Sequence, residues 1–354
     1  MLPGQESSFP PSGDDLSGGM IEPDAPERRE AADEAPPPVG TTPPAQLAAL
    51  AVQGKRGAAW RLLHWIGEDS PEAIEAIRQL PDRRLLELLL EWLALGTWAG
   101  KPLKVPRAMR QPHVRTQVRT LFLPGSGVPA DVVKAVLIGG LHHPQAAVRE
   151  TAAHLLGILG EPTTAADLAD ALHDQASAVR VQAAKALGRL HIPGTAAALV
   201  GALRYHDEAL ASQIHQALLE LESAAVPALI QATASPDAWV RWHALRILGE
   251  LHDARGLRPL VVGLADEDRA AAWMAAHALA LMDAPVVEEV LHLLLRAPDT
   301  PQLMETAAYV LRTQSNKQLK PILEPVIQSM HDVDYRVAMP LAVERALEQL
   351  ADEA

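Results

Sequence analysis

Apolar residues recur at helical spacing along most of the chain, in stretches that are separated by short polar turns. "VRETAAHLLGILG" begins at Val148, "VRVQAAKALGRLH" at Val179 and "VRWHALRILGELH" at Val240. In each copy apolar residues fall at the first, fifth, eighth or ninth, and twelfth residues, which places them on one face of an α-helix. The starting residues lie 31 and then 61 residues apart, which is one and then two periods of an internal repeat.

Two weaker copies complete this series. "LASQIHQALLELE" from Leu210 fills the missing period, and "AAAWMAAHALALM" from Ala271 follows in the next one. A second apolar stretch, such as "TAAALVGALRYHD", lies between successive copies and ends in a turn that contains Asp. Asp237 stands just before one copy, where its side chain is well placed to cap a helix N-terminus. Each repeat is therefore predicted to be a pair of antiparallel helices.

The repeat pattern predicts an all-α fold, an α-solenoid in which antiparallel helix pairs stack into a superhelix. Neither helix of a pair can bury its apolar face alone, whereas stacked pairs share a continuous core. The composition agrees, since 48% of the residues are hydrophobic and only 3% are aromatic. A core built mainly from Ala, Leu and Val favours helices over a wide β-sandwich.

Composition divides the chain into three predicted parts. Residues 1–45 hold ten prolines and nine acids against two arginines, a net charge of −7 out of −13 for the whole chain. Such a stretch buries too little apolar surface to offset the entropy of ordering. We predict a disordered acidic tail over 1–44, an N-terminal helical cap with a basic loop over 45–112, and the repeat array with a C-terminal cap over 113–354.

The repeated pattern Asp-x-x-Val-Arg-x-x-Ala-x-x-x-Leu-Gly resembles HEAT repeats. Its short form is similar to the HEAT-like repeat of phycobilin lyase subunits, and the resemblance covers roughly residues 113–350. It implies a HEAT-like or armadillo-like right-handed α-solenoid, with the helices that begin in Val-Arg lining the concave side.

The resemblance also implies a ladder of ion pairs between successive repeats. Its arginines follow the Val of three copies and its acids stand in the turns; the members are Arg149, Arg180 and Arg241, with Asp174, Asp237 and Asp268. Ala211 and Ala272 occupy the Arg position of the two weaker copies, so the ladder is expected to be interrupted there.

Two positions of each copy point away from the predicted core. Advancing 100° per residue from the Val, the third and seventh residues face outward. The third residues are Glu150, Val181, Ser212, Trp242 and Trp273, and the seventh are His154, Lys185, Gln216, Arg246 and His277, with Trp239 one turn before Trp242.

One interpretation of these outward residues is a partner-binding patch, because Trp and Arg are enriched at interface hot spots. The two indoles would then form one apolar surface on adjacent repeats. The other interpretation is that each Trp fills a groove between small residues and that the seventh residues form an ordinary solvated face. His243 lies on the flank of its helix, where we expect a contact between repeats.

A basic patch lies upstream of the array. No acid occurs from Trp92 to Ala130, whereas six basic residues do: Lys101, Lys104, Arg107, Arg110, Arg115 and Arg119. The acidic tail, an acidic partner or RNA are all candidate ligands, and an ordinary basic loop is the alternative. The net charge of −13 disfavours general nucleic-acid binding, which needs a basic footprint.

The sequence offers no motif for catalysis, a cofactor or a metal. There is no cysteine, no phosphate-binding Gly-x-x-x-x-Gly-Lys-Ser/Thr loop and no Gly-x-Ser-x-Gly elbow. Some HEAT-like enzymes bind two irons through His-Glu dipeptides, and no such dipeptide occurs among the 14 histidines. We therefore expect no catalytic residue, cofactor or metal ligand, although an enzymatic role stays open.

These observations predict a non-catalytic protein–protein interaction scaffold or adaptor that presents a concave solenoid surface. Its partners are expected to be other proteins, with an acidic or extended segment, and its oligomeric state is left open. Two alternatives remain: a phycobilin-lyase-like or other chromophore-handling or enzyme-assisting protein, and nucleic-acid binding through residues 101–119. No signal peptide and no apolar stretch long enough to span a membrane is visible, so we expect a cytoplasmic protein.

Overall fold

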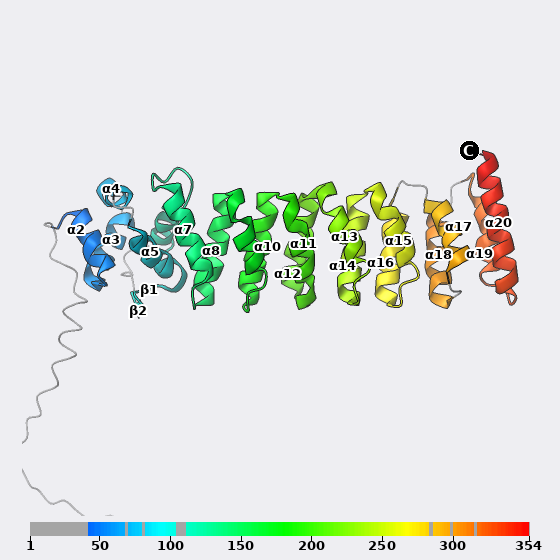
Figure 1. The fold of residues 1–354 in the computed structure, drawn as a ribbon, viewed down its shortest axis with the longest axis horizontal. Helices are drawn as coiled ribbons and strands as arrows, with labels where there is room; N and C mark the ends of the chain where they lie inside the picture. Colours follow the sequence, from blue (N-terminus) through cyan, green and yellow to red (C-terminus); the bar gives the residue numbers. More distant parts are fainter. Residues whose placement is uncertain are drawn as a thin grey trace, which may run out of the picture.

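Helices stack side by side in an elongated array in the computed structural model, with their axes roughly across its long direction (Figure 1). The structure describes residues 42–67, 70–79, 82–103, 111–282, 286–297, 300–314 and 317–353. Within these residues the only strands form one hairpin of two residues on each side. The predicted all-α solenoid is confirmed. Residues 1–41 of the predicted acidic tail lie outside the described part.

The N-terminal elements pack against the start of the array. α3 contacts α6, and α5 contacts α7 and α8. These elements are α2 (Pro44–Val52), α3 (Arg56–Gly67), α4 (Pro71–Gln79), α5 (Arg83–Leu95), β1 (Thr97–Trp98), β2 (Lys101–Pro102) and α6 (Gln111–Thr120).

The array alternates two sets of helices. We call the second helix of each pair a repeat helix: α8 (Ala146–Leu159), α10 (Ser177–Leu190), α12 (Glu208–Glu220), α14 (Ala238–Leu251), α16 (Arg269–Ala280) and α18 (Pro301–Gln314). The linking helices are α7 (Ala130–Leu141), α9 (Ala165–Ala171), α11 (Ala196–Gly201), α13 (Val226–Ala232), α15 (Leu257–Gly263) and α17 (Val286–Arg296), and the chain ends in α19 (Lys320–Ser329) and α20 (Tyr335–Glu353).

Local capping explains where the repeat helices begin and end. The Asp237 side chain accepts a hydrogen bond from the backbone N–H of Trp239, which confirms the predicted cap of α14. α8, α10 and α14 end at equivalent residues in the left-handed conformation, namely Gly160, His191 and His252, with φ of 70°, 50° and 50°. Such a residue breaks the helix and turns the chain towards the next linking helix.

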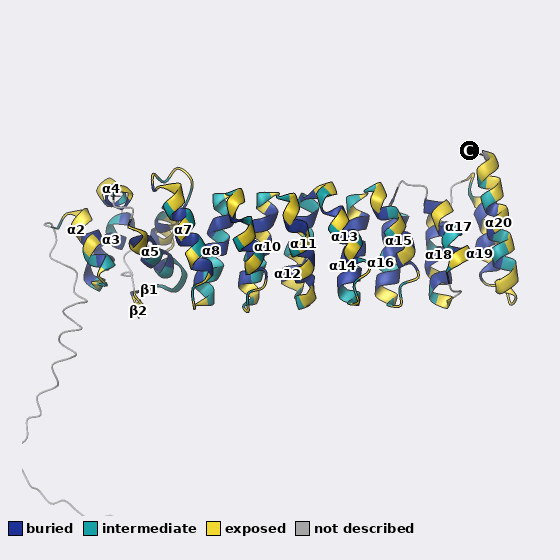
Figure 2. Ribbon diagram, in the orientation of Figure 1, coloured by how far each residue is buried: buried dark blue, intermediate teal, exposed yellow. Residues whose placement is uncertain are grey.

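The core is a continuous layer of small and branched apolar side chains between the two sets of helices. Each repeat helix carries a buried stripe and an exposed stripe along its length (Figure 2). The buried stripe consists mainly of Ala, Leu, Val and Ile, as the composition predicts. Among the described residues, no helix combines the length and the apolarity needed to span a membrane.

Glycine at the tenth residue of a sequence copy, counted from Val148 and its equivalents, lets the next repeat helix approach closely. A Cβ atom at Gly157 would lie 2.7 Å from the Cβ of Ala186, and one at Gly249 would lie 2.4 Å from the Cβ of Ala278. Gly188 faces Ala217 on α12 in the same way, with 3.0 Å to its Cβ. At these three junctions the backbone of one helix packs against an alanine methyl group of the next. A larger side chain at the glycine would hold the two helices further apart.

The junction between α12 and α14 breaks this rule. Leu219 stands where the other helices have glycine, and Ile247 stands where the next helices have alanine. The two helices accordingly pack less closely than their neighbours. The array thus has two tightly packed blocks, α8–α12 and α14–α16, joined by a wider junction.

The arginine at the second residue of a sequence copy, directly after its Val, joins successive turns. Nε and Nη2 of Arg149 donate to the two carboxylate oxygens of Asp174, at 2.6 and 2.8 Å. Nη1 of the same side chain donates to the backbone carbonyls of His143 and Pro144, in the turn before its own helix. One guanidinium therefore ties its own turn to the turn of the next repeat.

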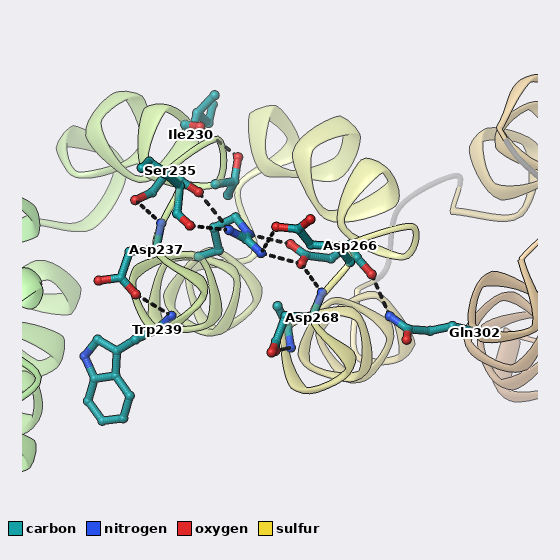
Figure 3. A network of polar contacts seen from close by, with 12 residues as sticks. Ile230, Ser235, Asp237, Trp239, Asp266, Asp268 and Gln302 are labelled. Carbon is teal, nitrogen blue, oxygen red and sulfur yellow. Dashed lines mark hydrogen bonds and ion pairs between the residues drawn. The ribbon is translucent and has the colours of Figure 1, made fainter.

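Arg241 repeats this arrangement in the second block. Its guanidinium donates to both oxygens of Asp266, at 2.7 and 2.8 Å, and to the carbonyls of Ser235 and Pro236. Figure 3 shows the surrounding network, in which Asp266 also accepts from the backbone N–H of Asp268. Both charged side chains are more than 90% buried, so the pair is shielded from solvent.

The partners of the ladder differ in part from those that the family resemblance implies. Arg149 pairs with Asp174 as expected, but Arg180 pairs with Asp207 and Arg241 with Asp266. Asp237 and Asp268 instead cap α14 and α16, because they stand at the last residue of their turns and face the first N–H groups of the helix. Arg180 also lies over the ring of Tyr205, 4.5 Å from its centroid.

Replacing Gly249 by alanine tests the close approach. The new methyl group would collide with Ala278, so we expect a loss of about 1–3 kcal/mol in the free energy of unfolding. The control is Gly201→Ala, where the new methyl meets open space and the helical φ of −60° suits alanine. The control should match the wild type or exceed it by up to about 1 kcal/mol in urea denaturation. Equal effects at both sites would refute the packing account.

Replacing Asp266 by alanine tests the arginine ladder. The change leaves Arg241 charged and buried, with two carbonyls and the exposed Glu267 as its remaining partners, so we expect a loss of about 3 kcal/mol in the free energy of unfolding. Glu267→Ala is the matched control, because Glu267 is 88% exposed and lies 3.5 Å from the same guanidinium. The control should cost less than about 1 kcal/mol. A neutral Asp266→Ala would contradict a structural role for the ladder.

Candidate functional site

The repeat helices present one continuous surface, which we call the repeat-helix face. It is formed by the third and seventh residues of each sequence copy, counted from Val148 and its equivalents, and the seventh residues are more exposed than the third. Lys185, Gln216, Arg246 and His277 are exposed in this row, and His154 is half-buried. Trp242 and Trp273 are half-buried at the third position and also pack against the core. Four successive repeat helices, α10 to α16, therefore expose the seventh residue of their copy, and α8 half-buries it.

A pocket of about 360 Å³ opens at the N-terminal end of this face. The basic patch and the row of seventh residues meet in this pocket, because Arg115 and Arg119 line it together with His154. α5, α6, α8 and α10 contribute its walls, through Leu93, Arg115, Thr116, Arg119, Glu150, Thr151, His154, Leu155 and Gln182.

The electrostatics around His154 mark this pocket as positive. Burial lowers the pKa of His154 below its usual value, and the charges of Arg119, Arg189 and Lys185 lower it further. Three cations from α6 and α10 thus act on one imidazole of α8. The ring is held neutral near pH 7, where it can donate one hydrogen bond and accept another.

A second pocket of about 130 Å³ lies one repeat further along, between α10 and α12. Lys185, Arg189 and Gln216 line it, with Glu220 at its edge. The amide of Gln216 donates to Glu220 at 3.2 Å, which occupies this carboxylate. The seventh residues His154, Lys185 and Gln216 therefore follow one another along two adjacent pockets.

The charged side-chain groups of four residues in these pockets have no ion pair or hydrogen bond within the described part of the chain. They are Arg115, Arg119, Lys185 and Arg189, and we call them the cationic patch. The remaining basic residues of the sequence prediction are placed elsewhere. Lys101 lies exposed in β2, whereas Lys104, Arg107 and Arg110 lie outside the described residues.

Aromatic side chains dominate the C-terminal half of the face. The ring of Trp273 contacts the rings of His277 and Tyr309, with centroid distances of 6.0 and 5.4 Å. The hydroxyl of Tyr309 lies 3.1 Å from Nδ1 of His277, so a hydrogen bond fixes this cluster across α16 and α18. The three rings form a half-exposed platform.

Trp242 has different neighbours from Trp273. Its ring lies edge-on to His243, and the guanidinium of Arg246 lies 5.7 Å from its centroid. Arg246 in turn pairs with Glu250 one turn along the helix, at 3.0 Å. Within the described residues no ring contact joins Trp242 to Trp273, so each indole belongs to its own cluster.

Histidines gather at the wider junction between α12 and α14. His206 lies 2.7 Å from a carboxylate oxygen of Asp237, and His215 lies 2.7 Å from one of Glu250. His206 also stacks on Trp239, at 5.6 Å and 15°. Trp239 is half-buried in this seam, which fits a groove-filling role better than an exposed patch.

His243 is the buried member of this histidine seam. It is 4% exposed, lies edge-on to Trp239 and Trp242, and neither ring nitrogen has a hydrogen-bond partner in the described structure. Burial, followed by the charges of Arg246 and His215, lowers the pKa of His243 to about 4. The expected contact between repeats is therefore a neutral imidazole enclosed by two indoles.

Sequence reasoning missed three residues of the face. Tyr309 on α18 lies 32 residues after His277, and the row of seventh residues could have been extended to it by adding one more period. Gln182 and Arg189 lie beside the outward positions on α10 and enter only because the pockets lie between helices. In the described residues no group of His, Asp and Glu converges as metal ligands do.

Comparison with family models matches residues 226–312 to HEAT repeats. The matched segment runs from α13 into α18 and contains the half of the repeat-helix face where aromatic side chains cluster. The family model describes HEAT repeats in general, so the phycobilin lyase type of the repeat is not confirmed. No curated protein matches the chain.

Three solved structures are similar to the chain at low identity. An engineered protein shares 16% identity and a TM-score of 0.35, covering 88% of this chain and 99% of that one. The Escherichia coli protein YibA shares 18% sequence identity and has a TM-score of 0.34; the match covers 77% of this chain and 95% of that one. Human deoxyhypusine hydroxylase in complex with glycerol shares 18% sequence identity and has a TM-score of 0.26; the match covers 67% of this chain and 98% of that one.

Replacing His243 by methionine tests the seam, since Met274 occupies the equivalent position of α16. A folded-state pKa of about 4 lies below the unfolded value near 6.5, so the unfolded chain binds the proton first. Stability should therefore fall by up to about 2 kcal/mol as the pH drops from 7 to 5. His243→Met should remove that part of the decline and stabilise the fold by about 1 kcal/mol at pH 7.

The control for this titration is His142→Gln, at an exposed residue after α7. Its urea-denaturation midpoints should follow the pH dependence of the wild type. An unaltered pH dependence in His243→Met would show that His243 is not the group that titrates.

Proposed function

From the HEAT repeats matched in residues 226–312, we propose that this chain is a non-catalytic scaffold that binds a protein partner on the repeat-helix face. HEAT-type arrays expose an extended surface because each repeat contacts only its neighbours. A partner that lies along such a surface touches the same position of several helices in turn. The proposal predicts that binding energy resides in the third and seventh residues.

The observation that carries the proposal is the half-exposed aromatic platform of Trp273, His277 and Tyr309, with Trp242 and Arg246 on the preceding repeat helix. Contiguous large apolar groups on a surface are typical of interaction sites. Trp, Tyr and Arg are the residue types that dominate binding energy at protein interfaces. They stand here beside exposed polar side chains, which supply the polar rim of such an interface.

The opposite side of the array offers a weaker candidate surface. Val262 is 59% exposed on α15, where it stands apart from the aromatic residues. Single exposed apolar residues are common on protein surfaces and do not indicate a partner. The contrast between the two sides supports placing the partner on the repeat helices.

Replacing Trp242 and Trp273 together by alanine tests the proposal. A single hot-spot tryptophan contributes about 2 kcal/mol or more, which is about 30-fold in affinity, so the double variant should bind its partners at least about 30-fold more weakly in affinity capture. Captured proteins are identified and quantified by mass spectrometry against the wild type. Helical circular dichroism of the double variant should stay close to that of the wild type.

Val262→Ser is the matched control, because it removes an exposed apolar group from a linking helix. It should capture the same proteins as the wild type. If the double tryptophan variant retained these proteins, or if the control lost them equally, the repeat-helix face would not be the binding surface.

A further inference from the structure

The cationic patch stands out against the charge of the rest of the chain. Arg115 and Arg119 come from α6, and Lys185 and Arg189 come from α10. Two acids, Glu150 and Glu220, line the same pockets, so the net charge of the patch is about +2 in a chain of −13. Neighbouring cations that lack an internal partner repel one another and favour an external anion.

The N-terminal segment of the same chain is an anion, of opposite charge to the patch. Residues 1–41 hold nine acids and two arginines, a net charge of −7, and the described chain begins directly after them at Thr42. α2 packs on α3, and α3 packs on α6, which carries Arg115 and Arg119. The axes of α2 and α6 are therefore separated by two helix spacings of about 8–10 Å each.

The length of the segment is sufficient to reach the patch. Glu34 is eight residues before Thr42, which gives a reach of up to about 27 Å for an extended chain. A tether of this kind holds its ligand at an effective concentration in the millimolar range. Weak carboxylate–guanidinium contacts, which are too weak for a separate peptide, are then sufficient for substantial occupancy.

We propose that the acidic N-terminal segment, residues 1–41, is a ligand of the cationic patch and competes with the partner for the repeat-helix face. Its Asp and Glu carboxylates are the groups that Arg115 and Arg119 bind, with His154 between them and α10. This inference rests on the proposed function, since the segment regulates access to the same surface. It commits to a peptide carboxylate ligand, because the acidic segment is tethered to the same chain, whereas a free polyanion would have to bind without that advantage.

His154 reports occupancy of the patch directly. A carboxylate brought next to this imidazole offsets the cations that lower its pKa, so occupancy raises the pKa of His154. The groups that face the ring are Arg119 on α6, Lys185, Arg189 and Gln182 on α10, and Glu150 on its own helix.

The experiment measures the pKa of His154 by NMR in the full chain labelled with ¹³C-histidine, at low salt. His154→Gln identifies the signal. Changing the nine acids of residues 1–41 to their amides should lower the pKa of His154 by about 0.5 or more. Raising the sodium chloride concentration to 0.5 M should have the same effect on the wild type, because salt screens exposed ion pairs.

Two controls separate docking from a diffuse charge effect. His331, between α19 and α20 at the other end of the array, should not respond to the tail substitutions. In Arg115→Gln/Arg119→Gln, whose replaced side chains are exposed and whose guanidinium groups form no ion pair in the described residues, neutralising the tail should no longer move the pKa of His154.

The outcomes decide the proposal without a partner protein, so they stand apart from the test of the scaffold function. Equal pKa values of His154 in the wild type and in the neutralised chain would overturn it. A shift that persists in Arg115→Gln/Arg119→Gln would also overturn it, because the patch would then not be the docking site. If single-stranded oligothymidylate, but not the acidic segment, moved His154, the patch would be a nucleic-acid site and the proposal would be wrong.

Discussion

The rest of the structure depends on how closely one repeat helix approaches the next. At Gly157, Gly188 and Gly249 the backbone of one helix meets an alanine of its neighbour, with no room for a further methyl group. This spacing brings each turn near the following one, where Arg149 or Arg241 can bridge the two. With one side of each helix fixed in this way, the third and seventh residues face solvent in register, and a row of side chains becomes a surface.

Between α12 and α14 both the glycine contact and the arginine bridge are missing. Ala211 lacks the guanidinium that would reach the next turn, and Leu219 takes the place of the glycine. Hydrogen bonds from His206 and His215 to acids of the next repeat, and the buried His243, fill the wider junction instead. The two halves of the surface also differ in character, since cations line the pockets before this junction and aromatic rings cluster after it.

Periodicity and local chemistry predicted much of this architecture. Apolar spacing identified the repeat helices, and Asp237 was predicted as a cap because capping depends only on adjacent residues. The partner of Arg241 could not be predicted, because Asp266 and Asp268 stand in the same turn. Only the conformation of the turn decides that Asp266 faces the guanidinium of the preceding repeat helix. The pocket that joins Arg119 to His154 depends on how the N-terminal helices pack on the array, which no spacing within one repeat specifies.

The central claim is that a protein partner lies along the repeat-helix face. A photo-crosslinking amino acid at Gln216, an exposed seventh residue in the middle of that face, tests it in the cell without relying on the energetics of any one contact. The same amino acid at Val262 on α15 samples the linking helices. The account predicts crosslinked protein adducts from Gln216 and none from Val262. Adducts from Val262 with none from Gln216 would contradict it.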